Sequence, residues 1–485
     1  MSVRVRFAPS PTGYLHIGGA RTALYSYLYA KAKGGSFVLR IEDTDLERSK
    51  REFEESQIAD LEWLGLVADE GPQKPGEYGP YRQSERLETY KEMAWELIAK
   101  GFAYPCFLSK EELDELTVKA EAEKKSPHAY HGQYRDADLS ESKKRIDSGE
   151  SYVIRFKNPQ KPYTFTDLVR GEVSFQEDMV GDFVILRASG MPVYNFCCTV
   201  DDHLMKISHV IRAEEHLNNT LRQLMLYEAF EATPPEFAHV SLLVGEDRQK
   251  LSKRHGATSV SQYKEQHYMP EALVNYLCLL GWSHPDETDI FELDEIISLF
   301  DLTRFSKSSA LYDVQKLNFF NEQHMRKLSP EQWIQKIEKS LSPESLFHEQ
   351  NQDWKRKFYE LYQEKIQVAP EAQGKVDEIF QEQVNLQDED LKEALSWEST
   401  PALFQHISDE LAEVKEDENL SVESVEKWMG HLKKELKIKG KPLFMGTRAV
   451  LTGQTHGPDL KLLVSLTPVS VLKNRLSQVA QALVK

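Results

Sequence analysis

VRVRFAPSPTGYLHIGG, at residues 3–19, determines the expected fold together with the residues that follow it. Val3–Phe7 is a short strand, and from residue 18 to residue 33 apolar side chains recur at helical spacing. Gly34-Gly35 ends that helix, and Phe37–Ile41 is the next strand. A strand, a helix and a strand at this spacing form a βαβ unit, so we expect a parallel sheet.

The loop Pro9–Gly19 joins the first strand to the first helix. Open parallel sheets bind ligands at this place, because strand C-termini and a helix N-terminus meet there. Glycines let a nucleotide approach the backbone, and His16 can hydrogen-bond phosphate oxygens. A glycine turn before a helix is also common without a ligand, so the loop alone leaves both interpretations open. The Pro-Ser-Pro-Thr-Gly prefix is less easily explained by the needs of a turn.

The segment from about Phe107 to Arg187 breaks the α/β rhythm and indicates an insertion in the first domain. Ser109–Glu112 is a capping box that opens a charged helix. A polar loop follows around residues 126–133, and then come strand-like runs such as Tyr152–Phe156 and Val180–Leu186. The rhythm resumes with Tyr194–Val200, His209–Ile211 and a helix at Asn219–Phe230.

After His255 the chain becomes mostly helical. Ser329 is an expected N-cap with Pro330 in the first turn and Gln332 at the third position, which is a strong helix start. From there on the sequence predicts amphipathic helices. The tryptophans expected to anchor their core are Trp333, Trp354, Trp397 and Trp428.

A short basic run, Lys250–Arg254, follows the apolar run Val240–Val244. Such runs are usually solvated loops. At the edge of a sheet, however, a basic loop could fold over a triphosphate and offset the charge that builds on a leaving pyrophosphate.

Composition sets wider limits. A chain of 485 residues predicts about three domains, and the formal net charge of −18 gives weak evidence against a nucleic-acid partner, because local charge decides such binding. Four cysteines do not suggest a disulfide framework, so we expect small buried apolar residues. The first residues form a strand and not a leader, and no apolar run is long enough to span a bilayer, which predicts a cytoplasmic protein without membrane contact.

The two loops, with a βαβ core between them, resemble the two signatures of class I aminoacyl-tRNA synthetases, usually written HIGH and KMSKS. The chain is most similar to the bacterial-type glutamyl-tRNA synthetases, and the resemblance covers essentially the full length. The first signature ends here in Gly19 and the second in Arg254, and both variants are usual in that family. The residues that carry the match are Arg6–Gly13, Leu39–Asp45, Tyr81–Ser84, Tyr194–Phe196, Val200–His203, His209–Glu215, Lys250–Arg254, Lys441–Leu443 and Arg448–Gly453.

The resemblance implies a reaction and a set of site residues. ATP and glutamate would form glutamyl-adenylate and pyrophosphate, and the glutamyl group would pass to the 3′ end of tRNA with release of AMP. Catalysis would involve His16, Gly18, Gly19, Lys250 and Lys253. Glutamate would bind Arg6, Ala8, Ser10, Glu42, Tyr194 and Arg212. ATP would bind Pro9, His16, Gly18, Gly19, Thr44, Glu215, His216, Leu243 and Lys253.

For two of these residues the sequence alone offers a simpler interpretation. Arg6 could be a surface charge on the first strand, and its spacing favours that interpretation. Glu42 could be a capping acid in an acidic turn, a role that Asp43 and Asp45 could also fill.

The resemblance also implies the fold class: a Rossmann-like parallel-sheet catalytic domain with an α+β insertion, then a helical stem-contact region and a helical anticodon-binding part. We place the catalytic domain at residues 1–106 and 188–240 and the insertion, which would bind the acceptor stem, at residues 107–187. The stem-contact region with the Lys250–Arg254 loop would be residues 241–325, and the anticodon-binding region residues 326–485, split near 375.

The implied partners are L-glutamate, tRNA(Glu) and, in some members of the family, tRNA(Gln), with ATP accompanied by Mg²⁺ and with tRNA needed for the activation step. We expect a monomer. Some relatives bind zinc in the inserted domain, but here Cys106 is alone and the segment His131–Tyr134 has no cysteine, so we expect no zinc and no other protein-bound metal. The cluster Lys433, Lys434, Lys437, Lys439, Lys441 and Arg448 is either an RNA contact or a solvated helix face.

Three other functions stay open at this point. A short paralogue that glutamylates a modified tRNA base lacks the anticodon-binding part, whereas this chain continues about 160 residues past Met325. A non-catalytic relative would usually lose pocket residues such as Arg6, Glu42, Arg212 and Lys253. A small-molecule nucleotidyltransferase would leave the helical C-terminal region unexplained.

Overall fold

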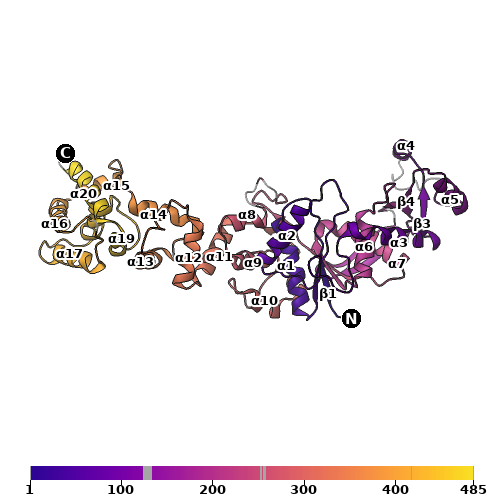
Figure 1. Cartoon of the computed structure of the whole chain (residues 1–485), viewed down its shortest axis with the longest axis horizontal. Coiled ribbons are helices and arrows are strands. Elements are labelled where there is room, and N and C mark those ends of the chain that lie inside the picture. Colours follow the sequence, from indigo (N-terminus) through magenta and orange to yellow (C-terminus); the bar gives the residue numbers. More distant parts are fainter. Residues whose placement is uncertain are drawn as a thin grey trace. The chain divides into compact units, whose positions relative to one another are not determined.

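The computed structural model describes residues 2–123, 134–177, 179–251, 254, 258–416 and 418–483. The chain forms two compact units, one of residues 1–265 and 270–320 and the other of residues 266–269 and 321–485 (Figure 1). Among the described residues, no helix has the length and apolar character needed to cross a membrane.

A mainly parallel sheet organises the first unit, in the strand order β2-β1-β8-β9-β5-β6. Every neighbouring pair is parallel except β5 and β6. The strands are β1 (Arg4–Phe7), β2 (Ser36–Leu39), β5 (Tyr163–Asp167), β6 (Gly171–Phe175), β8 (His209–Ala213) and β9 (Glu236–Val240). The expected βαβ unit and parallel sheet are therefore confirmed.

The order of the strands reverses at β1, because β2 lies on one side of it and β8 on the other. Such a reversal leaves a crevice at the carboxyl ends of the two strands that run to opposite sides. β1 and β8 end at Phe7 and Ala213, so the crevice lies next to Arg6 and Arg212.

The remaining strands form two small sheets. An antiparallel sheet joins β3 (Ala103–Cys106), β4 (Val153–Phe156) and β7 (Phe183–Leu186), while β10 (Leu243–Val244) pairs with β11 (Ala310–Leu311). The strand-like runs anticipated around residues 152–156 and 180–186 correspond to β4 and β7. β5 and β6 come from the same interrupting segment of the chain, yet they extend the main sheet.

The helices before residue 327 are α1 (Ile17–Ala32), α2 (Arg51–Trp63), α3 (Leu87–Ala99), α4 (Lys110–Ala122), α5 (Leu139–Asp147), α6 (Tyr194–Leu204), α7 (Leu217–Ala229), α8 (Val260–Glu265), α9 (Pro270–Leu279), α10 (Leu293–Leu299) and α11 (Val314–Arg326). The expected capping box forms at α4, where Ser109 Oγ accepts from the Glu112 N–H at 3.2 Å and Glu112 Oε2 accepts from the Ser109 N–H at 2.7 Å. After α1 the chain turns back through Gly34, whose positive φ favours glycine. Gly35 is also required, since a Cβ there would lie 2.2 Å from the Val3 carbonyl oxygen.

The second unit is helical in its described part, coloured orange to yellow in Figure 1. Its helices are α12 (Pro330–Ser340), α13 (Gln352–Tyr362), α14 (Ala372–Phe380), α15 (Glu389–Leu395), α16 (Thr400–Ala412), α17 (Val422–Lys434), α18 (Thr447–Thr452), α19 (Leu460–Leu466) and α20 (Val469–Leu483). Ser329 and Gln332 form the expected capping box of α12. Trp333, Trp354 and Trp428 are buried as expected, and Trp397 is partly buried against the same helices as Trp428.

Trp333 offers a test of this core. Its ring is fully buried, 5.4 Å from the ring of Tyr359, so Trp333→Ala should lower the free energy of unfolding of the helical unit by about 3–5 kcal/mol. Urea denaturation followed by circular dichroism measures the change. Trp397→Ala removes the same ring from a partly buried position and should lower the free energy of unfolding by clearly less. An equal loss for both variants would contradict the placement of Trp333 in the core.

Candidate active site

A cavity of about 660 Å³ lies at the crevice where the strand order reverses. Most of the residues that the sequence singled out line it. They are Arg6, Ala8, Ser10, His16, Gly18, Gly19, Glu42, Tyr194, Arg212, Glu215, His216, Leu243 and Lys250.

Three of the anticipated residues are placed differently. Thr44 lines a smaller cavity of about 180 Å³, which shares Ser10, Glu42 and Tyr194 with the larger one. Pro9 lies outside both linings, and its carbonyl accepts from the Glu42 N–H at 2.9 Å. Lys253 lies outside the described residues.

His16 is the N-cap of α1. Its Nδ1 accepts a hydrogen bond from the Gly18 N–H at 3.1 Å, so the neutral ring carries its proton on Nε2. Burial, reinforced by the charge of Lys250, lowers the pKa of His16 and favours this neutral form. The ring therefore has one N–H to donate and one nitrogen already engaged at the helix N-terminus.

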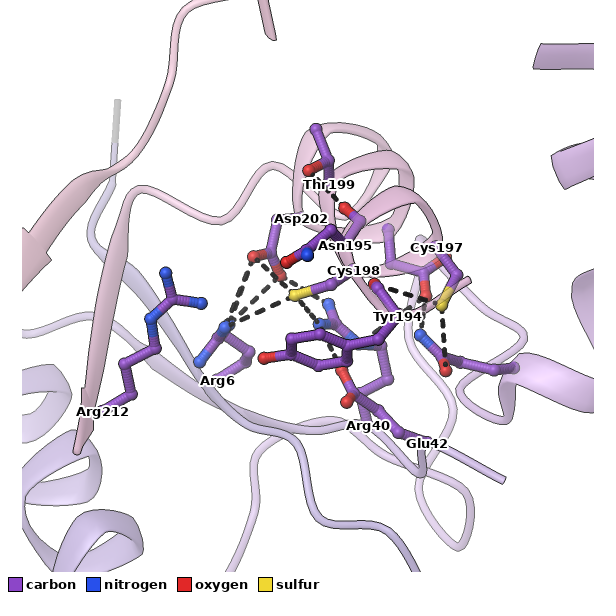
Figure 2. A network of polar contacts seen from close by, with 12 residues as sticks. Arg6, Arg40, Glu42, Tyr194, Asn195, Cys197, Cys198, Thr199, Asp202 and Arg212 are labelled. Carbon is purple, nitrogen blue, oxygen red and sulfur yellow. Dashed lines mark hydrogen bonds and ion pairs between the residues drawn. The ribbon is translucent and has the colours of Figure 1, made fainter. Parts of the chain in front are cut away.

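Figure 2 shows a buried network of charges, of which Arg6 and Glu42 line the cavity. Asp202 on α6 accepts from Arg6 Nε at 3.1 Å and from Arg40 Nη1 at 2.6 Å. Arg40, fully buried just after β2, also donates to Glu42 Oε1 at 3.1 Å. Burial acts to lower the pKa of Arg6, but the charge of Asp202 outweighs it and raises that pKa. The interpretation of Arg6 as a surface charge is wrong, since the side chain is buried and ion-paired.

Glu42 reaches the cavity from this network. Its side chain is buried, and burial raises the pKa of its carboxyl group, an effect that Arg40 and Arg6 partly offset. Its carboxylate bonds Arg40, so it does not act as the capping acid that the sequence left open.

Arg212, near the end of β8, has a different environment. Its Nε donates to His239 Nε2 at 3.1 Å, and its Nη2 donates at 2.8 Å to both Thr220 Oγ1 and Gln223 Oε1. Every one of these acceptors is neutral, and no carboxylate of the described residues lies within ion-pair distance of Arg212. Its Nη1 is buried without a hydrogen-bond partner. A buried cation with unused N–H groups is costly unless a ligand completes it.

Tyr194, the first residue of α6, completes this end of the cavity. Figure 2 shows its phenol oxygen directed toward Arg6 and Arg212. Burial raises the pKa of this phenol, so it is protonated and can donate. Three donor side chains therefore converge on one part of the cavity, and they suit a carboxylate.

Residues at the start of the basic loop and residues just beyond it both contact other parts of the site. Lys250 pairs with Glu215, and the Leu251 N–H donates to the Leu243 carbonyl at 3.1 Å. Beyond the loop, the Thr258 carbonyl accepts from the Ile17 N–H at 2.8 Å. The described ends of the basic segment therefore lie next to the N-terminus of α1.

The sequence also predicts that the protein holds no zinc or other metal ion. The described ranges hold no group of three His, Cys, Asp or Glu side chains arranged to bind a metal ion. Cys106 is buried in β3, and the segment His131–Gln133 lies outside those ranges. All four cysteines are buried and free, as expected.

Arg40, Asp202 and Arg21 matter to the site, although the sequence analysis assigned none of them a role. Arg40 and Asp202 lie inside two of the motifs that carry the resemblance, and this position could have identified them as site residues. Arg21 lines the cavity from α1, where Nη1 donates to the Leu280 carbonyl at 2.8 Å and Nη2 donates to the Ser241 carbonyl. A cation among the apolar positions of a helix was the available sign of its burial.

Comparisons with known proteins agree with this geometry. The model of the class I tRNA synthetases (E and Q), catalytic domain, matches residues 2–319, and that of an anticodon binding domain matches residues 323–480. Glutamate–tRNA ligase 1 of Caldicellulosiruptor saccharolyticus is 42% identical over 481 residues, covering 98% of each chain. The glutamate–tRNA ligase of Bdellovibrio bacteriovorus is 45% identical over 485 residues, covering 98% of this chain and 97% of its own.

Solved structures lead to the same family. A crystal structure of a glutamate tRNA ligase from Elizabethkingia meningosepticum, in complex with its amino acid, has a TM-score of 0.86 and 32% identity, with full coverage of both chains. The glutamate-tRNA synthetase of Elizabethkingia anophelis gives the same values. The expected fold class and resemblance are confirmed, and the chain belongs to the class I tRNA synthetases of the E and Q group.

Proposed function

We propose that this chain ligates L-glutamate to the 3′ end of tRNA(Glu) in two steps, through glutamyl-adenylate with release of pyrophosphate and then AMP. Its relatives with 42–45% identity over nearly their full length are glutamate–tRNA ligases. The observation that carries the proposal is Arg212, a buried guanidinium at the cavity with only neutral partners and an unused Nη1.

Arg212, Arg6 and Tyr194 bind the side-chain carboxylate of glutamate in this proposal. Arginine suits this role because its planar fork of N–H donors matches a carboxylate. Glu42 pairs with the α-ammonium, while Ala8 and Ser10 line the same end of the cavity. Glutamine lacks the charge, so its binding would leave the buried guanidinium of Arg212 unpaired at a cost of about 3–5 kcal/mol. That cost corresponds to discrimination on the order of a thousandfold.

ATP binds along the N-terminus of α1, and the class uses it as its magnesium complex. The His16 Nε2–H and the Gly19 amide donate to its phosphates, Gly18 orients the His16 ring through its N–H, and the helix N-terminus also favours negative charge. Lys250 and Lys253 stabilise the leaving pyrophosphate. Pro9, Thr44, Glu215, His216 and Leu243 surround the nucleotide.

The chemistry requires no nucleophile from the protein, because the α-carboxylate of glutamate itself attacks the α-phosphorus of ATP. Pyrophosphate leaves, and the 3′-terminal ribose of tRNA then attacks the adenylate carbonyl with AMP as leaving group. The protein contributes position and charge compensation at the phosphates.

The rest of the chain holds the tRNA. We assign residues 107–187 to the acceptor stem, residues 241–325 to the stem contact and residues 326–485 to the anticodon, with a division near 375. The catalytic domain comprises residues 1–106 and 188–240. We propose a cytoplasmic monomer that contains no zinc. Some members of the family charge both tRNA(Glu) and tRNA(Gln), and tRNA(Gln) is then a further partner.

Glutamate-dependent exchange between ATP and pyrophosphate, measured with and without tRNA(Glu), tests the function. We expect exchange with glutamate and none with glutamine, and we expect charged tRNA(Glu) in an aminoacylation assay. Glutamate-dependent exchange without charging of tRNA(Glu) would favour the paralogue that glutamylates a modified base of a different tRNA. Exchange without any amino acid would favour a nucleotidyltransferase, and no activity at all would favour a non-catalytic relative.

Arg212→Gln keeps an N–H donor but removes the charge and shortens the side chain. Because the substrate carboxylate then lacks its buried cation, kcat/KM for glutamate should fall by about 100-fold or more, corresponding to about 3–5 kcal/mol. Arg222→Gln on α7 is the matched control, since Arg222 lies outside the cavity lining. Full activity of Arg212→Gln would mean that the carboxylate binds elsewhere.

The basic cluster of the helical unit predicts an RNA contact. Lys439 and Lys441 are exposed, and neither forms an ion pair among the described residues. Reversing both charges to Glu should weaken tRNA binding, lower the dependence of log Kd on log salt by about one to two, and leave ATP affinity unchanged. Lys392 and Lys415, which pair with Glu389 and Glu418, serve as controls for the same substitutions. Unchanged tRNA affinity would remove this cluster from the interface.

A further inference from the structure

Three buried side chains connect the inserted segment with the cavity. Asp167 ends β5, His239 lies on β9 and Arg212 on β8, which are neighbouring strands of the main sheet. His239 and Arg212 are direct partners in the β8–β9 register. The side chains of Asp167 and His239 are both 0% exposed. None of the proposed roles above uses Asp167 or His239.

The hydrogen bonds determine where the His239 proton lies. Arg212 Nε always carries a hydrogen, so His239 Nε2 must accept it across their 3.1 Å contact. The proton of the neutral ring is then on Nδ1, which donates to Asp167 Oδ2 at 2.6 Å. Thr220 Oγ1 lies 3.2 Å from the same Nε2 and accepts from Arg212 Nη2 at 2.8 Å.

Asp167 is held in one orientation. Its Oδ1 accepts from the N–H groups of Val169 at 2.9 Å and Arg170 at 2.8 Å, and its Oδ2 accepts from the ring of His239. The backbone N–H of His239 also donates to this carboxylate, 3.2 Å from Oδ1 and 3.1 Å from Oδ2. Burial acts to raise the pKa of Asp167, but the hydrogen bonds from His239 and the backbone outweigh it and lower that pKa, so the group is a carboxylate. A carboxylate is acceptor-only, and it therefore keeps the Nδ1–H tautomer of His239 in place.

The ring separates the charge of Asp167 from Arg212. Arg6 shows the alternative arrangement, because Asp202 bonds it directly and compensates its charge. A carboxylate bonded directly to Arg212 would likewise compete with a substrate carboxylate. The neutral ring orients the guanidinium without neutralising it, and Nη1 is buried without a hydrogen-bond partner.

We propose that His239 and Asp167 are positioning residues for substrate recognition: Asp167 fixes the tautomer of His239, and His239 holds Arg212 as an oriented, uncompensated cation for the glutamate carboxylate. This inference rests on the proposed function of Arg212. It extends the recognition of glutamate to a residue of the inserted segment, two side chains away from the substrate.

Asp167→Asn tests the proposal. Oδ1 can still accept from Val169 and Arg170, but the amide NH₂ now faces His239 Nδ1 and moves the ring proton to Nε2, against the N–H of Arg212. We expect KM for glutamate to rise about 10- to 100-fold, since a hydrogen bond to a charged group is lost, while KM for ATP stays within about twofold. Asp182→Asn is the matched control, because Asp182 is another buried carboxylate from the inserted segment that accepts from Arg135 and lies outside the cavity lining.

A second pair of variants guards against misfolding of Asp167→Asn. His239→Gln can present a carbonyl to Arg212 and an amide to Asp167, whereas His239→Leu can do neither. We expect His239→Gln to keep a glutamate KM at least about tenfold lower than that of His239→Leu at equal thermal stability. A purely structural role would instead lower the melting temperature and leave both KM values unchanged.

The outcomes distinguish a failure of the proposed function from a failure of the positioning role. If the wild-type enzyme shows no glutamate-dependent exchange in the presence of tRNA(Glu), the proposed function itself fails. If the wild-type enzyme uses glutamate but Asp167→Asn, or the His239 pair where Asp167→Asn does not fold, leaves the glutamate KM unchanged, the positioning role is overturned.

Discussion

The carboxylate of Asp202, shared between Arg6 and Arg40, is the contact on which the site depends. It links α6 to β1 and to the chain just beyond β2, all in the buried interior. Removal of one partner would leave a buried charge without compensation, which typically costs several kcal/mol. Because Arg40 also holds Glu42, and Asp201 on the same helix holds Arg86 at 2.7 Å, the network fixes the walls of the cavity before any substrate arrives.

Local patterns predicted the elements of the fold but not which faces are buried. Val3–Phe7 alternates apolar residues with arginines, which suggests a strand with one face in water. β1 is a central strand of a parallel sheet and is buried along its whole length, so Arg4 and Arg6 are buried too. Their carboxylate partners, Glu70 and Asp202, lie 66 and 196 residues further along the chain. No window of sequence around β1 contains the information that identifies these pairs.

Sequence patterns predicted local structure correctly where the interaction joins residues close together in the chain. The capping boxes at Ser109 and Ser329 formed as expected, since each depends on residues three positions apart. β5 and β6 were not singled out, although the aromatic–polar alternation of Tyr163–Asp167 and the turn before Gly171 are hairpin signals. Even so, no local signal tells that this hairpin extends the main sheet and brings Asp167 to His239.

In the proposed function, the charges around the cavity account for a preference for glutamate. Arg6, Arg40 and Arg86 are matched in number by Asp201, Asp202 and Glu42, whereas the direct partners of Arg212 are neutral and the ring of His239 separates it from the carboxylate of Asp167. Glutamate at neutral pH has two carboxylates and one ammonium, and its net charge of about −1 offsets that of Arg212. Glutamine, with no net charge, would leave Arg212 buried without a directly bonded counter-charge. In the proposed function, selectivity arises because Arg212 lies at the cavity and its direct partners are all neutral.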